Sequence, residues 1–215
     1  MNRTMEKGIF ITFEGGEGCG KSSHIKSLAQ YFESKGKQCV ITREPGGTPL
    51  SEKIRDLLLN AKEGAKMSPR AELLLFEASR AQHVDELILP SLAEGKVVLC
   101  DRFADSSSAY QGVARNLGDD AVQWLNNFAV AGATPDMTIL LDIPAEVGIA
   151  RANARDNDSP DRMGAEKISF YEAVRESFLK IASQNSNRFA VIDSSGEKDA
   201  TFEKILKAVK EKFDV

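Results

Sequence analysis

The sequence predicts an α/β fold in which a parallel sheet of five strands is flanked by helices. Short apolar runs alternate along the chain with longer segments of helical periodicity. Each run is apolar almost throughout, which is typical of strands buried on both faces, and helices between such strands favour a parallel sheet. The predicted strands are Ile9–Glu14, Cys39–Arg43, Val97–Asp101, Met137–Asp142 and Phe189–Asp193.

Helical periodicity fills most of the chain between and after these strands. Gly36, Gly95 and Gly132 stand where helices are expected to stop. Pro90 lies inside the third pattern, and we expect it to end or kink that helix because proline lacks a backbone N–H. The predicted helices span residues 21–35, 50–59, 69–93, 119–131, 145–155, 166–183 and 200–213.

The chain of 215 residues predicts one domain, residues 1–215, with a mobile insert. No repeat or linker divides it. The stretch 155–165 breaks the regular pattern because it is polar and rich in turn-forming residues. We expect a mobile surface segment there, within a lid of about residues 151–165.

Charge and cysteine content narrow the partners and the compartment. The chain carries 28 Lys and Arg against 32 Asp and Glu, a net charge of −4, which argues against a nucleic-acid partner. Its three cysteines are odd in number and widely spaced, which favours the cytoplasm. No apolar run is long enough for a membrane span and no leader pattern is present, so we expect no membrane association.

The strongest motif is Gly15-Gly16-Glu17-Gly18-Cys19-Gly20-Lys21-Ser22, which fits the phosphate-binding pattern G-x-x-x-x-G-K-[ST] between a predicted strand and a predicted helix. Glycines let backbone N–H groups converge on phosphate oxygens at a helix N-terminus. Lys21 can then reach the outer phosphates of ATP, and the Ser22 hydroxyl can ligate Mg²⁺. This loop predicts a P-loop NTPase-type fold of three layers. A glycine-rich turn without a ligand is the plainer alternative, and Cys19 is expected to serve only as a small side chain.

Other residues must choose among P-loop proteins, because the loop alone names no reaction. The guanine-reading pattern N-K-x-D of GTPases is absent, and the chain has neither the length nor the charge of a motor or helicase. Arg43 and Arg102 follow predicted strands, where ligands of open α/β sheets collect. Phe76 and Arg80 share one helical face, and a ring beside a guanidinium suits a nucleobase.

At this point the chain resembles the thymidylate kinase family over nearly its whole length, from Gly8 to about Phe213. The resemblance rests on motifs that recur in the same order: residues 13–15 leading into the P-loop, 42–48, 75–80, 101–103 and 109–112. It implies transfer of a phosphoryl group from ATP to dTMP in dTTP synthesis. It also implies a parallel five-stranded core, a homodimer and a lid that closes over ATP.

The resemblance assigns roles to individual residues. Phe76 would stack on thymine, Arg80 would bond its O4, Ser107 and Gln111 would complete the base pocket, and Tyr110 would crowd a ribose 2′-hydroxyl. Glu17 would face the 3′-hydroxyl. Asp101 would act at the Mg²⁺ shell beside Ser22. The monophosphate would be bound by Arg43, Arg55 and Arg102, and the catalytic set would comprise Glu17, Lys21, Arg102 and the lid arginines Arg151, Arg155 and Arg162.

Two departures from the family pattern refine this reading. Phe103 stands where the family commonly has Tyr or His, and Gly18 stands where some members have a P-loop arginine. The pattern therefore resembles the bacterial type, in which the lid supplies the catalytic positive charge. Plainer alternatives remain open: Phe76 as a core residue, Arg55 paired with Glu52 or Asp56, and the lid arginines as a solvated basic loop.

His24 and His83 are predicted to be solvated or structural, since no cluster of metal ligands accompanies either. Two other functions also stay open: a kinase for a different nucleoside monophosphate, and a non-catalytic nucleotide switch.

Overall fold

The computed structural model describes residues 8–60, 66–156, 166–213 and 215. Its centre is a fully parallel sheet of five strands in the order β2-β3-β1-β4-β5. The strands are β1 (Ile9–Glu14), β2 (Cys39–Arg43), β3 (Val97–Asp101), β4 (Met137–Asp142) and β5 (Phe189–Asp193). All five agree with the predicted ranges, which confirms the α/β fold class.

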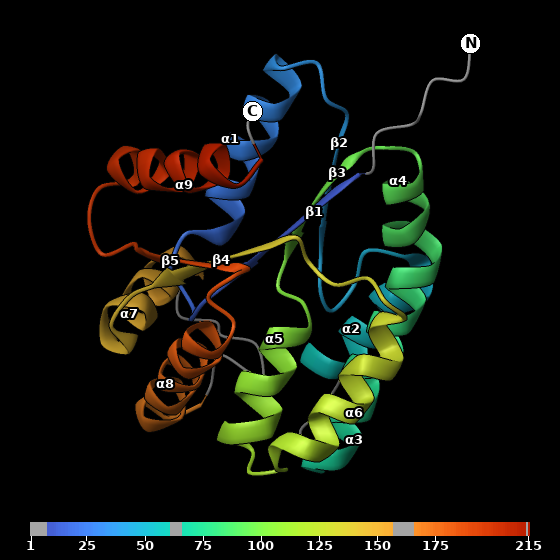
Figure 1. Cartoon of the computed structure of the whole chain (residues 1–215). Helices are drawn as coiled ribbons and strands as arrows, with labels where there is room; N and C mark the ends of the chain where they lie inside the picture. Colours follow the sequence, from blue (N-terminus) through green and yellow to red (C-terminus); the bar gives the residue numbers. More distant parts are fainter. Residues whose placement is uncertain (1–7, 61–65, 157–165, 214) are drawn as a thin grey trace.

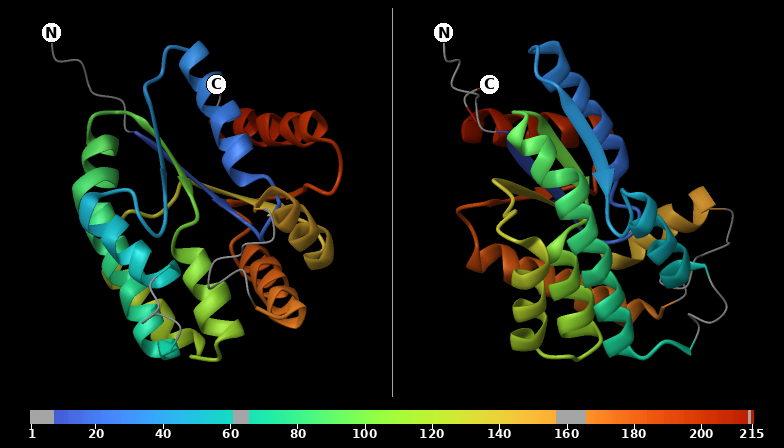
Figure 2. Two further views of the ribbon diagram at one scale, coloured as in Figure 1. Left: turned by 180° about the vertical axis from the view of Figure 1, so that it is seen from behind. Right: turned by 90° about the vertical axis from the view of Figure 1, so that its right-hand side faces the viewer.

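Helices cover both faces of the sheet and make three layers (Figures 1 and 2). On one face, α1 (Lys21–Ser34) and α9 (Lys198–Phe213) pack on alternate β1 residues such as Ile11 and Phe13. The residues between them face the other side, where Phe10 packs with the helices that lead into β3. The remaining helices are α2 (Pro49–Leu59), α3 (Pro69–His83), α4 (Leu89–Ala93), α5 (Ala104–Ser107), α6 (Asp119–Val130), α7 (Ala145–Asp156) and α8 (Ile168–Gln184).

Pro90 was expected either to end or to kink the third predicted helix, and it does not end it. The segment runs as α3, a π-helical turn η2 (Val84–Ile88) and then α4, which contains Pro90. A π turn changes the hydrogen-bond register, and Pro90 sits near the start of α4, where its missing N–H costs little. The chain therefore continues as helix for a short distance beyond the proline.

A helical segment that was not predicted follows β3 and lies beside the predicted site. It comprises α5 and the π-helix η3 (Ser108–Ala114). Three consecutive serines and Gly112 give this stretch low helix propensity, so its sequence shows no helical pattern. Packing of η3 against α8 and α6 supports it instead. This segment carries Ser107, Tyr110 and Gln111.

The strand order reverses at β1, because β2 and β3 lie to one side of it and β4 and β5 to the other. In a parallel sheet all carboxyl ends meet at one edge, and ligands collect there at the point of reversal. The segments after β1, β2 and β3 therefore gather the P-loop, Arg43 and Arg102. In the described part of the chain, no helix has the length and apolar character needed to cross a bilayer.

Candidate active site

The P-loop follows β1 and opens α1, as its motif predicts. Gly15, Gly18 and Gly20 have positive φ, and a Cβ at Gly18 would collide with the carbonyl oxygen of Gly148 in α7. An arginine at position 18 would therefore clash with the α7 backbone, which accounts for the glycine found there. The loop and α7, the helix in which the predicted lid begins, are thus in direct contact.

Lys21 and Ser22 are hydrogen-bonded within the P-loop region in a way that suits a nucleotide site. The Lys21 Nζ is only slightly exposed and donates to the Gly15 and Gly16 carbonyls at 3.2 and 2.8 Å. Ser22 Oγ donates to Asp101 Oδ2 at 2.8 Å. A hydroxyl and a carboxylate oxygen this close are the hard oxygen donors that Mg²⁺ prefers, and Mg²⁺ commonly takes its other ligands from phosphates and water. The donor set therefore fits a P-loop magnesium site.

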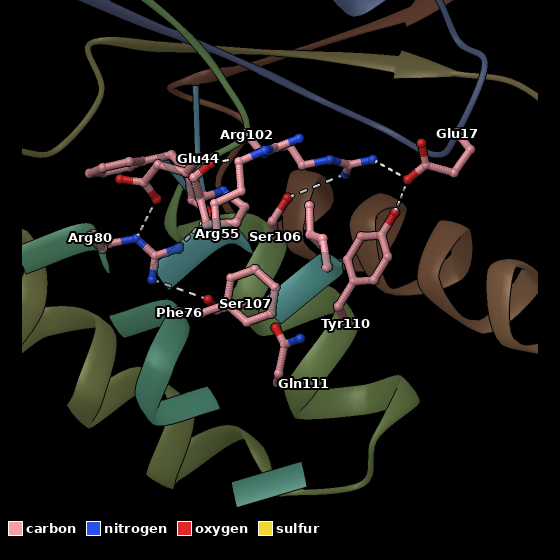
Figure 3. Close-up of a pocket in the computed structure, with 13 residues that line it drawn as sticks. Glu17, Glu44, Arg55, Phe76, Arg80, Arg102, Ser106, Ser107, Tyr110 and Gln111 are labelled. Atoms are coloured by element: carbon pink, nitrogen blue, oxygen red, sulfur yellow. Dashed lines mark hydrogen bonds and ion pairs between the residues drawn. The ribbon is translucent and has the colours of Figure 1, made fainter. Parts of the chain in front are cut away.

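Arg102 joins the P-loop to the neighbouring cavity. Its backbone has φ +67°, a conformation that is uncommon for a residue with a side chain. The guanidinium donates to the Gly15 carbonyl at 3.0 Å and to Glu17 Oε1 at 2.6 Å, and it lies 5.1 Å from the centre of the Tyr110 ring. The Tyr110 hydroxyl donates to the same Glu17 oxygen at 3.4 Å. Three predicted site residues thus form one hydrogen-bonded cluster (Figure 3).

A cavity beside this cluster brings together most of the residues predicted to bind the acceptor (Figure 3). Its wall draws on the segments that follow β1, β2 and β3, on α2 and α3, and on the unpredicted segment α5–η3, which lie far apart in the sequence. The lining residues are Glu17, Glu44, Pro45, Arg55, Leu59, Phe76, Arg80, Arg102, Phe103, Ser106, Ser107, Tyr110 and Gln111.

Arg80 is almost fully buried at the end of this cavity, where two carboxylates hold it. Its Nε donates to Glu44 Oε2 at 2.9 Å, and Nη1 donates to Glu77 Oε1 at 2.6 Å and to Asn126 Oδ1 at 2.8 Å. Nη2 donates to the Phe103 carbonyl, and that bond uses one of its two hydrogens. Burial opposes the charge, but the two carboxylates raise the pKa of Arg80 above its ordinary value. Arg80 is therefore a fixed cation.

The structure places three further residues for which plainer roles were open. Phe76 is half-buried and lines the cavity, so it is not part of the buried core. Arg55 donates to the Pro45 carbonyl at 2.8 Å and also lines the cavity. His83 is structural, because it is fully buried and hydrogen-bonded to Glu44 and Thr42.

His24 also belongs to the packed interior. It is buried and stacks on Phe202 with ring centres 6.2 Å apart, and its Nδ1 has no hydrogen-bond partner among the described residues.

A second, more open cavity lies over the P-loop. Arg43 and Arg151 line it together with Lys21, Ser22 and Asp101. Arg43 is half-exposed, and its Nη2 alone donates to both carboxylate oxygens of Glu52, at 3.0 and 2.9 Å. Arg151 donates to the carbonyls of the two serines after β5.

The side chains of the other two lid arginines, Arg155 and Arg162, cannot be placed in the site. Arg155 lies in the last turn of α7, but its side chain is outside the described part of the chain, as is the whole of Arg162.

Glu14 is a residue of the site that the sequence analysis did not select. It ends β1 directly before the P-loop, is fully buried, and accepts hydrogen bonds from the Phe103 N–H at 2.7 Å and from Ser106 Oγ at 2.6 Å. Burial, with the Asp105 charge, raises its pKa to about 8. Its position at the end of an apolar strand was the available signal. Glu14 fixes the turn that begins α5 and thereby the helix that carries Tyr110.

Phe103 has no polar role at its side chain. The ring is fully buried and meets Phe10 edge-on at 5.0 Å, and the Arg80 guanidinium lies 5.4 Å from its centre. The departure from the family's usual Tyr or His therefore leaves an apolar wall between the core and Arg80.

Comparison with known proteins points to one family. The family model described as thymidylate kinase matches residues 13–205. A protein named thymidylate kinase from Geobacter sulfurreducens is 52% identical over 90% of this chain and 92% of its own length, and one from Geotalea daltonii is 47% identical over 94% and 96%. The crystal structure of a thymidylate kinase from Ehrlichia chaffeensis has a TM-score of 0.77 and 33% identity, covering 94% of this chain and 99% of that one.

Proposed function

Because this chain belongs to the thymidylate kinase family, we infer that it transfers the γ-phosphoryl group of ATP to dTMP, giving dTDP and ADP. One observation carries the assignment to specific residues. The P-loop cavity and the acceptor cavity share Glu17, Glu44, Arg55 and Arg102 in their walls. Two nucleotides can therefore meet at Arg102, as direct phosphoryl transfer requires.

The reaction asks this protein for positioning and for positive charge. An oxygen of the dTMP phosphate attacks the γ-phosphorus in line, the bond to the β–γ bridging oxygen breaks, and ADP leaves. Lys21 and Arg102 both line the P-loop cavity and would neutralise the charge on the transferring group. No nucleophilic side chain is needed. A lid arginine would add further positive charge.

Ser22 and Asp101 would hold Mg²⁺, Ser22 as a direct ligand and Asp101 at the ion's ligand shell. When bound, the ion supplies charge neutralisation on the phosphates. The hydrogen bond between these two side chains keeps both oxygens on the same side of the P-loop.

The roles in the acceptor cavity follow from the side chains that line it. The aromatic face of Phe76 suits stacking on the base, and the remaining Nη2 hydrogen of Arg80 suits the thymine O4. Tyr110 and Glu17 are held together by Arg102, where the sugar would lie between base and phosphate. Ser107 and Gln111 would complete the base pocket, and Arg43, Arg55 and Arg102 would bind the monophosphate.

Substitution of Lys21 by alanine tests this function. We expect Lys21→Ala to lower kcat by about 10²–10³, the usual cost of removing one donor to a transition state. Loss of its hydrogen bonds to two loop carbonyls should lower the melting temperature by only about 2–4 °C. The measurement is ADP release from ATP with and without dTMP, alongside thermal unfolding.

The two rival functions give different outcomes in the same assay. ADP release that another nucleoside monophosphate stimulates as strongly as dTMP would indicate a different kinase. ADP release with no acceptor dependence would indicate a nucleotide switch. A near-normal kcat in Lys21→Ala would show that Lys21 takes no part in the reaction.

We also propose that the chain forms a homodimer through α6. Trp124 and Phe128 are 68% and 75% exposed and stack on each other with ring centres 6.1 Å apart. Helix α3 lies beside α6 (Figures 1 and 2), and its Leu74 is 55% exposed. Large apolar side chains open to water on neighbouring helices are typical of a protein interface.

The dimer has its own test. Sedimentation velocity should give twice the chain mass of 23.5 kDa for the wild type and the monomer mass for the double variant Trp124→Lys/Phe128→Lys. A monomeric wild type at micromolar concentration would contradict the proposal.

A further inference from the structure

A chain of hydrogen bonds runs from the acceptor cavity to a surface ion pair. Gln111 lines the cavity from η3, and its Nε2 donates to Glu72 Oε1 at 3.0 Å. Glu72, in the first turn of α3, is 2% exposed and also accepts from the Arg115 guanidinium at 3.2 and 3.4 Å. Arg115 in turn pairs with Glu166 at 2.7 Å.

These hydrogen bonds fix which end of the Gln111 amide faces the cavity. A carboxylate paired with a guanidinium only accepts hydrogen bonds, so the amide atom beside Glu72 must be the NH₂ group. The carbonyl Oε1 is then the atom left for the cavity. The oxygen and the nitrogen of the Gln111 amide are thus assigned from the hydrogen bond to Glu72. Figure 3 shows the Gln111 side chain extending from η3 toward the cavity.

We propose that Glu72 is a positioning residue for acceptor specificity, which makes Gln111 present a hydrogen-bond acceptor to the base. The proposal rests on the function inferred above. Thymine carries an N–H donor at N3 beside the O4 acceptor, whereas cytosine carries an acceptor at N3 beside an amino donor. Arg80 as donor and the Gln111 carbonyl as acceptor match the thymine edge at both atoms. Uracil has the same edge, so this device separates thymine and uracil from cytosine.

Arg115 keeps Glu72 in the acceptor state. The guanidinium contacts both carboxylate oxygens of Glu72 and lies 4.9 Å from the centre of the Phe170 ring in α8. Glu72 Oε1 accepts from both Gln111 Nε2 and Arg115 Nε, so a glutamine at position 72 could keep an oxygen there and hold the Gln111 amide as before. A Glu72→Leu variant removes the shared acceptor. The Gln111 amide is then no longer held with its carbonyl toward the base.

The test measures kcat and KM for dTMP at saturating ATP in four variants. Glu72→Leu should raise the KM for dTMP about tenfold, with kcat changed less than about twofold, because a Gln111 carbonyl that is no longer held toward the base binds it more weakly and the phosphates are untouched. Gln111→Ala should give a similar rise. The double variant should be no worse than Gln111→Ala alone, since Glu72 acts through that amide.

Glu166→Gln is the matched control. It removes the other carboxylate on Arg115 but leaves the Glu72 to Gln111 bond in place, so the KM for dTMP should stay unchanged. Equal effects of Glu72→Leu with and without the Gln111 side chain would overturn the proposal, because the residue would then act only on the fold. An unchanged KM in Glu72→Leu would overturn it as well.

A substrate analogue keeps the test open if Glu72→Leu does not fold. The N3-methyl derivative of dTMP lacks the N3 donor, so the wild type should use it at least about tenfold less well than dTMP, and Gln111→Ala should narrow that gap. Equal use of both nucleotides by the wild type would overturn the proposal. The inferred function fails separately, through absence of dTMP-dependent ADP release in the wild type.

Discussion

The wild-type protein is expected to use dTMP with a kcat/KM roughly 10⁴ times that for dCMP, because a site built around a specific hydrogen bond rejects a mismatched partner by about that factor. Arg80 cannot turn away from the amino group of cytosine, since Glu44 and Glu77 hold two of its nitrogens at 2.9 and 2.6 Å. A buried donor would face another donor. The kcat/KM for deoxyuridine monophosphate should be only about 10 to 200 times lower than that for dTMP. This nucleotide lacks the methyl group of thymine but can make the same hydrogen bonds.

Arg80→Ala should narrow the gap between dTMP and dCMP, because the discriminating donor is gone. The variant also leaves the buried Glu44 and Glu77 carboxylates without their cation, which typically destabilises a fold by about 3–5 kcal/mol. The ratio of the two kcat/KM values is unaffected by the fraction of folded enzyme, so it remains a valid readout. Equal use of dCMP and dTMP by the wild type would contradict the assignment.

The strands were fully predictable because their physics is local. A strand buried on both faces needs an apolar run, and a parallel sheet needs a helix between strands. Helix ends differ by a residue or two from their predicted positions, as at α9, which begins at Lys198 and not at residue 200. The segment α5–η3 was missed because tertiary contacts hold it. Its serines favour no helix, but Glu14 binds its first turn and the Asn126 amide binds Ala104 and Ser108.

The site divides in the same way. The P-loop could be predicted from its own residues, whereas no spacing in the sequence joins Phe76 to Tyr110; the family resemblance supplied that link. The support around Arg80 was beyond either source, because Glu44 and Asn126 lie 36 and 46 residues away in the chain. The role of Glu72 could not be predicted from the sequence either, since it acts by setting the direction of the Gln111 amide, which is distant in the chain.

The largest single loss of turnover is expected from a lid arginine. The P-loop of this chain has Gly18 in contact with Gly148, so no arginine can enter the site from the loop itself. The same contact holds the start of α7 against the P-loop, and Arg151, one turn further on, lines the P-loop cavity with Lys21. Arg155 follows four residues later in α7.

We therefore expect at least one of Arg151→Ala, Arg155→Ala and Arg162→Ala to lower kcat by about 10³–10⁵, the usual contribution of an arginine that stabilises phosphoryl transfer. The KM for dTMP should change little, because the acceptor cavity is lined by other residues. Arg70→Ala, which removes an exposed arginine from the start of α3, is the matched control and should keep full kcat.

Arg151 separates a catalytic contribution from a structural one. Its guanidinium donates to the carbonyls of Ser194 and Ser195 at 3.1 and 2.7 Å, so part of any loss could come from a displaced α7. Arg151→Lys retains the charge and one donor, and it should recover kcat only in part if a two-pronged guanidinium is required at the phosphates. Unchanged kcat in all three alanine variants would instead identify the segment as a solvated basic loop, and the charge that drives the transfer would then come from Lys21 and Arg102.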